Sequence, residues 1–171
     1  MKATQINKNE YNPYYKFYIE ELGGVELIEI LTASFNEFSA TIKNLTEEQL
    51  TYRYAEGKWT IKELIQHLID TERVMSYRAL RFSRNDATEL QGFDENWYVE
   101  NSNANDRNIA DIIEEFNHLR NTSISLFKSF STKMLLKSGL ANGSEMSVRA
   151  LGFIIPGHQL HHLKIIKERY L

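Results

Sequence analysis

The chain has 171 residues, a formal net charge of −3 at pH 7 and 42% hydrophobic residues, and it contains no cysteine. This length and composition are typical of one globular domain, so we predict a single domain over residues 1–171. The lack of cysteine excludes disulfide bonds, thiolate metal ligands and a cysteine nucleophile, and the slight acidic excess argues against general binding of nucleic acid.

Apolar residues are distributed in a way that predicts neither a secreted nor a membrane-spanning protein. The first residues lack the apolar stretch of a signal peptide, and no segment approaches 18 unbroken apolar residues. We therefore expect a cytoplasmic protein that has no membrane partner.

Aromatic residues crowd the segment from residue 11 to residue 18 near the N-terminus. A stacking platform for nucleic-acid bases would require interleaved basic side chains, and only Lys16 meets this requirement. We therefore expect this segment to form a helix or an arm that covers the rest of the domain.

Four segments show the three-and-four spacing of apolar residues that predicts amphipathic helices. The first covers about residues 25–42, the second begins after Thr60 and ends near Phe82, the third begins near Asn108, and the fourth begins near Ser147. At the start of the second helix, Thr60 and Glu63 have the spacing of a capping box.

Four helices in a chain with only two prolines and eight glycines predict an all-α fold, a four-helix bundle. The connection over residues 83–106 is long, so we predict a crossover between the second and third helices. Residues 141–144 (Ala-Asn-Gly-Ser) predict a turn before the fourth helix.

Two histidines interrupt the apolar stripe of the fourth helix. The stripe is formed by Val148, Leu151, Ile155, His158, His162, Ile165 and Arg169. Residues four apart share one helix face, so two imidazoles can reach a single ion. A third imidazole from another helix, such as His67, would complete an open site. The alternative is a pair of core histidines satisfied by hydrogen bonds, because unpaired burial of imidazole is costly.

Pro156 lies within this fourth helix, between Gly152 and Gly157. Proline removes one backbone hydrogen bond and clashes with the carbonyl group four residues earlier. We interpret the three residues as a kink that directs the histidines inward. The alternative is a break between two shorter helices.

Several short motifs, taken in their order along the chain, resemble the DinB-like superfamily of bacterial metal-binding four-helix proteins. They are Tyr14-Tyr15, residues 58–63, residues 67–73, residues 77–82, residues 92–95, residues 141–143, and residues 157–162. The resemblance implies a four-helix bundle of the DinB-like type over the whole chain. It also implies one divalent ion held by His67, His158 and His162, and a homodimer.

Neutral imidazoles suit zinc, nickel, iron or copper about equally; we expect zinc or nickel as this ion, with iron or manganese as alternatives. Some members of the superfamily are transferases that attach a low-molecular-weight thiol to an electrophile, or thiol-dependent isomerases, and others are described as hydrolases. The resemblance therefore implies a metal-dependent transferase that acts on a small thiol and an electrophile, because an ion would activate a bound thiol without a strong protein base. The alternatives are a metal-dependent hydrolase and a non-catalytic domain for ligand binding or sensing.

Three other residues are candidates for roles near the ligands. Glu63 lies one turn before His67 and is either a fourth ligand or, as we favour, part of the capping box. Asp70 lies three residues after His67 and is the weak candidate for a catalytic base or for an acceptor of a ligand N–H, but it also fits an exposed position. His161 would orient a neighbouring residue, assist proton transfer or, as we favour, lie on the surface, and His118 is expected to be exposed.

Charged residues near the end of the second helix and in the long connection have two interpretations. The four arginines are Arg73, Arg78, Arg81 and Arg84. They either interact favourably with the helix dipole and form surface ion pairs, or they bind an anionic small molecule. Asp94 and Glu95 either line a pocket or attach the connection to the bundle.

Overall fold

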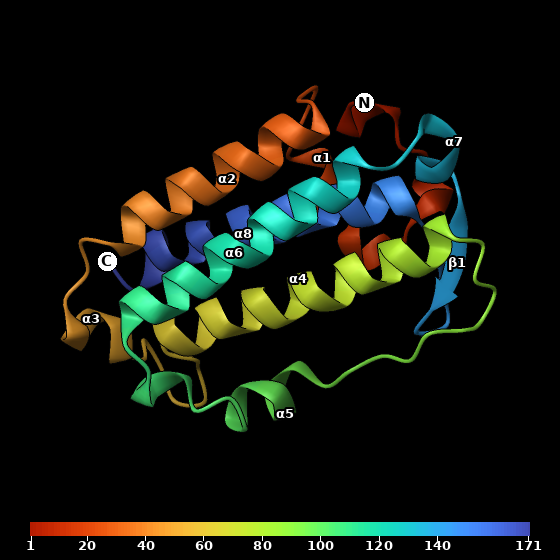
Figure 1. Ribbon diagram of the computed structural model, residues 1–171. Coiled ribbons are helices and arrows are strands. Elements are labelled where there is room, and N and C mark those ends of the chain that lie inside the picture. Colours follow the sequence, from red (N-terminus) through yellow and green to blue (C-terminus); the bar gives the residue numbers. More distant parts are fainter.

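Four long helices make up most of the computed structural model, which describes residues 1–171 (Figure 1). They are α2 (Leu27–Ile42), α4 (Ile61–Ser83), α6 (Ile109–Lys128) and α8 (Val148–Arg169). The all-α prediction and the four predicted helices are confirmed, with starts within two residues of those expected. No helix combines the length and hydrophobicity needed to cross a bilayer.

The start of each of the last three long helices depends on a side-chain cap. Thr60 and Glu63 exchange hydrogen bonds with each other's backbone N–H groups, at 3.1 and 2.7 Å. Asn108 and Ser147 accept hydrogen bonds from the backbone N–H groups of the first turns of α6 and α8. These bonds satisfy N–H groups that a helix leaves without partners at its start.

Short elements connect the long helices or cover them. They are α1 (Lys16–Glu20), α3 (Glu47–Thr51), α5 (Glu95–Glu100), α7 (Thr132–Leu135), strands β1 (Ser138–Ala141) and β2 (Ser144–Ser147), and 3-10 turns at Ala3–Gln5, Lys8–Glu10, Pro13–Tyr15 and Ala104–Asp106. Most of the aromatic N-terminal segment lies in the 3-10 turn Pro13–Tyr15 and in α1, which follows it directly. α1 packs against α8. The expectation of a covering arm is thus confirmed.

The connection between α4 and α6 is the longest in the chain. Figure 1 shows it running back along the bundle, so that α4 and α6 point in the same direction. Leu90 in this connection exchanges backbone hydrogen bonds of 2.9 Å with Leu140 and Asn142, and α5 packs against α4. The connection is therefore attached to the bundle along its length.

The turn expected at residues 141–144 is the loop of a β-hairpin. β1 and β2 pair antiparallel, with Ala141 opposite Ser144. Asn142 and Gly143 have φ angles of 51° and 70°, which are the left-handed values that a two-residue hairpin loop requires. The turn prediction was right, but it did not include the two strands beside it.

α8 excludes one alternative for the fourth helix and corrects the extent of its predicted stripe. It is continuous from Val148 to Arg169 with Pro156 inside it, so the alternative of two shorter helices is wrong. The predicted stripe continues too far, because Ile165 is only partly buried and Arg169 is exposed. Beyond His162, the buried residues are instead Leu163, Ile166 and Tyr170.

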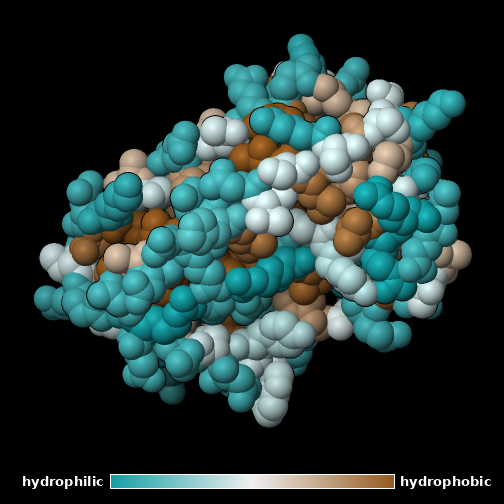
Figure 2. Space-filling model, in the orientation of Figure 1, coloured by the Kyte–Doolittle hydropathy of each residue, from teal (hydrophilic) through white to brown (hydrophobic).

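The core consists of two apolar clusters, one toward each end of the bundle. Along α6, Phe116 belongs to one cluster and Phe127 to the other, and the fully buried Arg120 lies between them in sequence. Arg120 pairs with Glu72 of α4 at 2.8 Å. On the face seen in Figure 2, hydrophobic surface is visible between α2 and α6, surrounded by hydrophilic side chains.

Candidate metal centre

Three histidines converge where α4 packs against α8. His67 comes from α4, and His158 and His162 are one turn apart on α8. The Nε2 atom of His158 lies 3.0 Å from Nε2 of His67 and 2.9 Å from Nε2 of His162. The structure therefore brings together the three residues predicted as ligands, and each points the same ring nitrogen toward the others.

The environment of these rings favours the neutral imidazole. Burial lowers the pKa of His67 to about 4. Burial, with the charges of His67 and His161, lowers the pKa of His162 to about 3. The pKa of His158 lies well below its usual value because of burial first and the neighbouring histidines second. Neutral imidazole is the form that binds metals.

The donor set fits a divalent ion. One nitrogen from each of the three histidines lies within 4.8 Å of the others, and ligands of a tetrahedral zinc ion are separated by about 3.4 Å. No carboxylate belongs to this group. Three neutral nitrogens directed at one point cannot all satisfy one another by hydrogen bonds, because each contact needs one donor and one acceptor. A bound cation would resolve this conflict.

A cavity of about 180 Å³ opens beside the three histidines. Its walls come from α1 and the turn before it, from α4 and α8, and from α5 of the long connection. The lining residues are Tyr14, Tyr15, Tyr18, Trp59, His67, Thr71, Met75, Glu95, Ile154, His158, His161 and His162. The prediction that the long connection contributes to a pocket is therefore correct for Glu95.

Glu95 is the only acidic residue that lines this cavity. Burial first, and the charge of Asp94 second, raise the pKa of its carboxyl group. Asp94 itself accepts a hydrogen bond of 3.0 Å from the Trp97 backbone N–H and so caps α5. Of the two acids considered together in the sequence, one lines the cavity and the other positions the helix that carries it.

Two other acidic candidates have different surroundings. Glu63 is held by the capping box and by Arg53, whose Nη2 lies 2.7 Å from its Oε1. Asp70 accepts hydrogen bonds from Gln66 at 3.0 Å and from Arg73 at 3.4 Å. Neither Glu63 nor Asp70 lines the cavity beside the histidines.

The four arginines of α4 and its C-terminus fall into two groups. Arg73, Arg81 and Arg84 are exposed or partly exposed, and the first two pair with Glu115 and Asp86. Arg78 is buried and lines a second cavity. The interpretation as surface ion pairs therefore fits Arg73 and Arg81 but not Arg78.

Sequence patterns did not identify several residues around the histidines. Thr71 lies four residues after His67, a spacing that places both side chains on the same helix face. This spacing could have identified Thr71 from the sequence. Its Oγ1 atom is buried without a hydrogen-bond partner. The ring of Trp59 packs 4.7 Å from that of His67, and the ring of Tyr18 lies 5.4 Å from that of His158. No sequence signal placed these rings there, since they depend on tertiary packing.

The predictions for the two remaining histidines, His118 and His161, have different outcomes. His118 is exposed, as expected. His161 is half-buried and lines the cavity, where its ring centroid lies 5.2 Å from that of Tyr18. The surface position favoured for His161 is therefore only partly right, because α1 covers this side of α8.

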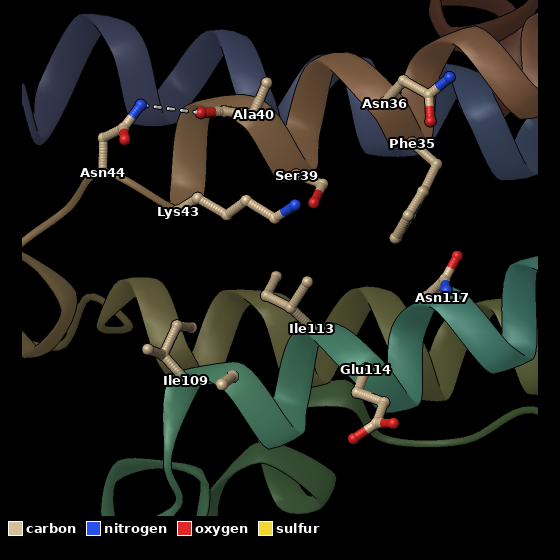
Figure 3. Close-up of a pocket in the computed structure, with 11 residues that line it drawn as sticks. Phe35, Asn36, Ser39, Ala40, Lys43, Asn44, Ile109, Ile113, Glu114 and Asn117 are labelled. Carbon is tan, nitrogen blue, oxygen red and sulfur yellow. Dashed lines mark hydrogen bonds between the residues drawn. The ribbon is translucent and has the colours of Figure 1, made fainter.

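A larger groove of about 760 Å³ lies away from the histidines, between α2 and α6. Figure 3 shows Phe35, Ser39 and Lys43 on one side of it and Ile109 and Ile113 on the other. The groove contains no histidine and no cluster of potential metal ligands.

Comparisons with known proteins identify the family of this chain and agree with its helical fold. Residues 30–166 match the sequence model of the DinB superfamily. A protein of Oceanobacillus iheyensis named "Putative metal-dependent hydrolase OB0413" is 27% identical over 136 residues, which are 77% of this chain and 76% of that protein. The structure of YfiT from Bacillus subtilis, described as a probable metal-dependent hydrolase with an unusual four-helix bundle topology, superposes with a TM-score of 0.76 at 16% identity. It covers 93% of this chain and 91% of that one. The chain belongs to the DinB superfamily.

Proposed function

We propose that the protein is a metal-dependent hydrolase in which His67, His158 and His162 hold one divalent ion and Glu95 is the general base. The observation that supports this most directly is the position of Glu95, which lines the same cavity as the three histidines. The names given to the relatives support the same reaction class. We propose zinc or nickel as this ion, with iron or manganese as the alternatives, because neutral imidazoles bind several transition metals.

A divalent ion held by the histidines would supply Lewis-acid activation of a nucleophile and stabilise negative charge that develops on the substrate. The protein side chains supply the rest. Glu95 is an exposed residue that also lines the cavity, and its raised pKa makes its carboxylate a stronger base than an unperturbed glutamate. Because Glu95 on α5 lines the same cavity as the histidines of α4 and α8, it would accept a proton from a nucleophile held in that cavity.

Two neighbouring side chains would orient the substrate. Thr71 lines the cavity, and its hydroxyl group is buried without a hydrogen-bond partner in the protein, so it would be available to bond a substrate oxygen. Tyr18 lies against His158 and His161 and covers one side of the cavity. Covering the site in this way excludes water and strengthens the electrostatic contacts inside it.

The test measures metal content and hydrolysis of the same samples. Protein freed of metal and reloaded with zinc or nickel is assayed against a panel of esters and amides. We expect about one ion per chain and activity that requires it. His67→Ala, His158→Ala and His162→Ala should lose the ion, whereas His118→Ala and His161→Ala should keep it.

A matched pair of variants tests the general base. Glu95→Gln preserves the shape of the side chain but removes its basicity, and we expect kcat to fall by about 10²- to 10⁴-fold while the ion stays bound. Asp94→Asn changes the neighbouring acid but keeps a good helix cap, and its kcat should stay close to that of the wild type. Equal activity of Glu95→Gln and wild type would refute the assignment.

A second candidate is the transfer of a low-molecular-weight thiol to an electrophile. The observation in its favour is that another cavity, of about 320 Å³, shares Tyr14, Tyr15 and Glu95 with the first. Two adjoining cavities have room for two reactants. Metal-dependent conjugation of a thiol to a chromogenic electrophile, with no hydrolysis of the ester and amide panel, would favour this candidate.

We also propose that two chains associate through the groove between α2 and α6. The groove has an apolar floor that includes Phe35 and Ile113, and its two walls carry opposite charges, Lys43 by α2 and Glu114 on α6. A two-fold axis through such a groove would place Lys43 of each copy against Glu114 of the other. This self-complementary arrangement is the one that symmetric dimers use.

A further inference from the structure

Four cationic side chains of this protein are buried, and they differ in one respect. Three have a carboxylate partner: Lys62 with Glu47 at 2.5 Å, Arg120 with Glu72 at 2.8 Å, and Arg149 with Glu10 at 2.6 Å. The fourth is Arg78, which is 3% exposed, and it forms no salt bridge with a carboxylate. Because an unpaired buried charge is costly, this exception calls for an explanation.

The contacts of Arg78 within the protein use only part of its hydrogen-bonding capacity. Its Nη2 atom donates to the Gln91 carbonyl oxygen at 3.0 Å, and Nη1 has a weak contact of 3.9 Å with the sulfur atom of Met75. The Tyr15 hydroxyl group is its other polar neighbour. None of these groups carries a full negative charge at neutral pH, although a guanidinium group presents five donors in a planar fork.

Arg78 lines the cavity of about 320 Å³ that adjoins the histidine cavity. The two cavities share Tyr14, Tyr15 and Glu95. Apart from Glu95, the other polar groups around Arg78 are neutral; among them is Asn12, whose amide donates a hydrogen bond of 2.7 Å to Ser144. The region thus has one cation, no salt-bridged counter-charge, and a direct connection to the proposed reaction site.

We propose that Arg78 binds the carboxylate group of a substrate whose reacting group lies beside His67, His158 and His162. This inference rests on the proposed function and adds the substrate class to it: small molecules that carry a carboxylate at one end and the bond to be cleaved at the other. Arg78 would be the residue that selects them. Glu95, on the wall that the two cavities share, would then lie between the carboxylate and the reacting group.

The charge of the region favours a carboxylate over a phosphate. The fork of one guanidinium group matches the two oxygens of one carboxylate in geometry and in charge. A phosphate dianion would add one more negative charge than a carboxylate to a cavity that also contains Glu95. A monoanion is therefore the better fit.

The experiment compares three probes of similar size or charge on metal-loaded protein. Benzoate carries the carboxylate, benzamide has the same shape without the charge, and inorganic phosphate is the other oxyanion. Binding is followed by NMR titration, with the Nε–H signal of Arg78 as the local reporter. We expect benzoate to bind and to shift that signal, and benzamide and phosphate to bind at least about tenfold more weakly.

The variants separate the role of Arg78 from a general charge effect. Arg78→Met keeps the length of the stem and should weaken benzoate binding by about ten- to a hundredfold. Arg84→Met is the matched control, because Arg84 also lacks a carboxylate partner but is exposed at the end of the same helix; it should bind benzoate like the wild type. Arg78→Lys keeps the charge without the fork and should show intermediate binding, which covers the case in which Arg78→Met does not fold.

Measuring zinc content on the same samples distinguishes the two proposals. If the wild type binds benzoate through Arg78 but no divalent ion through its histidines, the carboxylate site stands and the proposed function fails. If the wild type binds the ion and hydrolyses esters, but Arg78→Met and Arg78→Lys bind benzoate as tightly as the wild type, the carboxylate site is refuted. Equal affinity for benzoate and benzamide, or tighter binding of phosphate, would also refute it.

Discussion

The backbone carbonyl oxygen of Tyr18 lies so close to Gly157 that a Cβ atom at position 157 would approach it to 2.1 Å. Gly157 precedes His158 in α8, and Tyr18 belongs to α1. The missing side chain is what allows α1 to pack directly on the turn of α8 that carries the first of its two clustered histidines. Gly157 therefore determines how closely Tyr18 covers the cavity.

Gly157→Ala should displace α1 and destabilise the protein. The neighbouring atom is backbone, which cannot rotate away, so we expect the free energy of unfolding to fall by about 1–3 kcal/mol. Urea denaturation followed by tyrosine and tryptophan fluorescence measures this. Gly24→Ala is the control, because a Cβ atom there meets nothing within 4 Å. Equal stability of Gly157→Ala and wild type would show that α1 does not depend on this close approach.

The stability of the metal-free protein should fall as the pH decreases from about 6.5 to about 4. Burial lowers the pKa of His67 from 6.5 to about 4. Between these values the unfolded chain binds a proton at His67 and the folded chain does not, so protonation favours unfolding. The shift corresponds to a loss of about 3 kcal/mol at the acid end of this range.

Urea denaturation from pH 8 to pH 4 measures this dependence. His67→Gln should reduce the slope, whereas His118→Gln, which alters an exposed histidine, should leave it unchanged. A slope that is the same in His67→Gln and the wild type would contradict the role of His67.

Removing one member of the buried Arg120–Glu72 pair should cost more than removing both. Arg120 donates to Glu72, to the Leu31 carbonyl oxygen, to Ser34 and to Gln159, at distances between 2.7 and 3.2 Å. Arg120→Met leaves the Glu72 charge buried and unpaired, which costs about 3–5 kcal/mol. The double variant Arg120→Met, Glu72→Leu should recover part of this loss. A double-mutant cycle by chemical denaturation checks it, and additive losses would contradict the prediction.

Dimerisation through the α2–α6 groove should respond to charge reversal. Lys43→Glu places two like charges opposite each other across the proposed two-fold axis and should weaken the dimer by at least about tenfold. Glu114→Lys should have the same effect, and the double variant should restore association. Sedimentation or light scattering over a range of concentrations measures the dissociation constant. A monomeric wild type, or a double variant no tighter than either single variant, would refute this interface.

The local parts of the fold were predictable because short-range physics determines them. The capping box of Thr60 and Glu63 and the cap residue Ser147 mark the starts of α4 and α8 through residue type and spacing alone. The grouping of His67 with His158 and His162 required the family resemblance as well, since periodicity on α8 identified only a pair. The strands beside Asn142 were missed because four residues are too few to show a periodic pattern.

The residues that depend on tertiary packing were not predictable. Glu95 and Arg78 could not be separated in sequence from their neighbours Asp94 and Arg81, because the path of the long connection decides which side chain lines a cavity. The position of Trp59 over His67 depends in the same way on how residues 52–60 enter α4. Sequence patterns specify faces of helices, whereas the cavity is formed by loops that cross them.

His67 lies far along the chain from the other two clustered histidines, since 91 positions separate it from His158. During synthesis on the ribosome, α4 emerges long before α8 exists. Under the proposed function, all three ligands would be available to an ion only after the last long helix has been made. Metal uptake would then come late in the synthesis of each molecule.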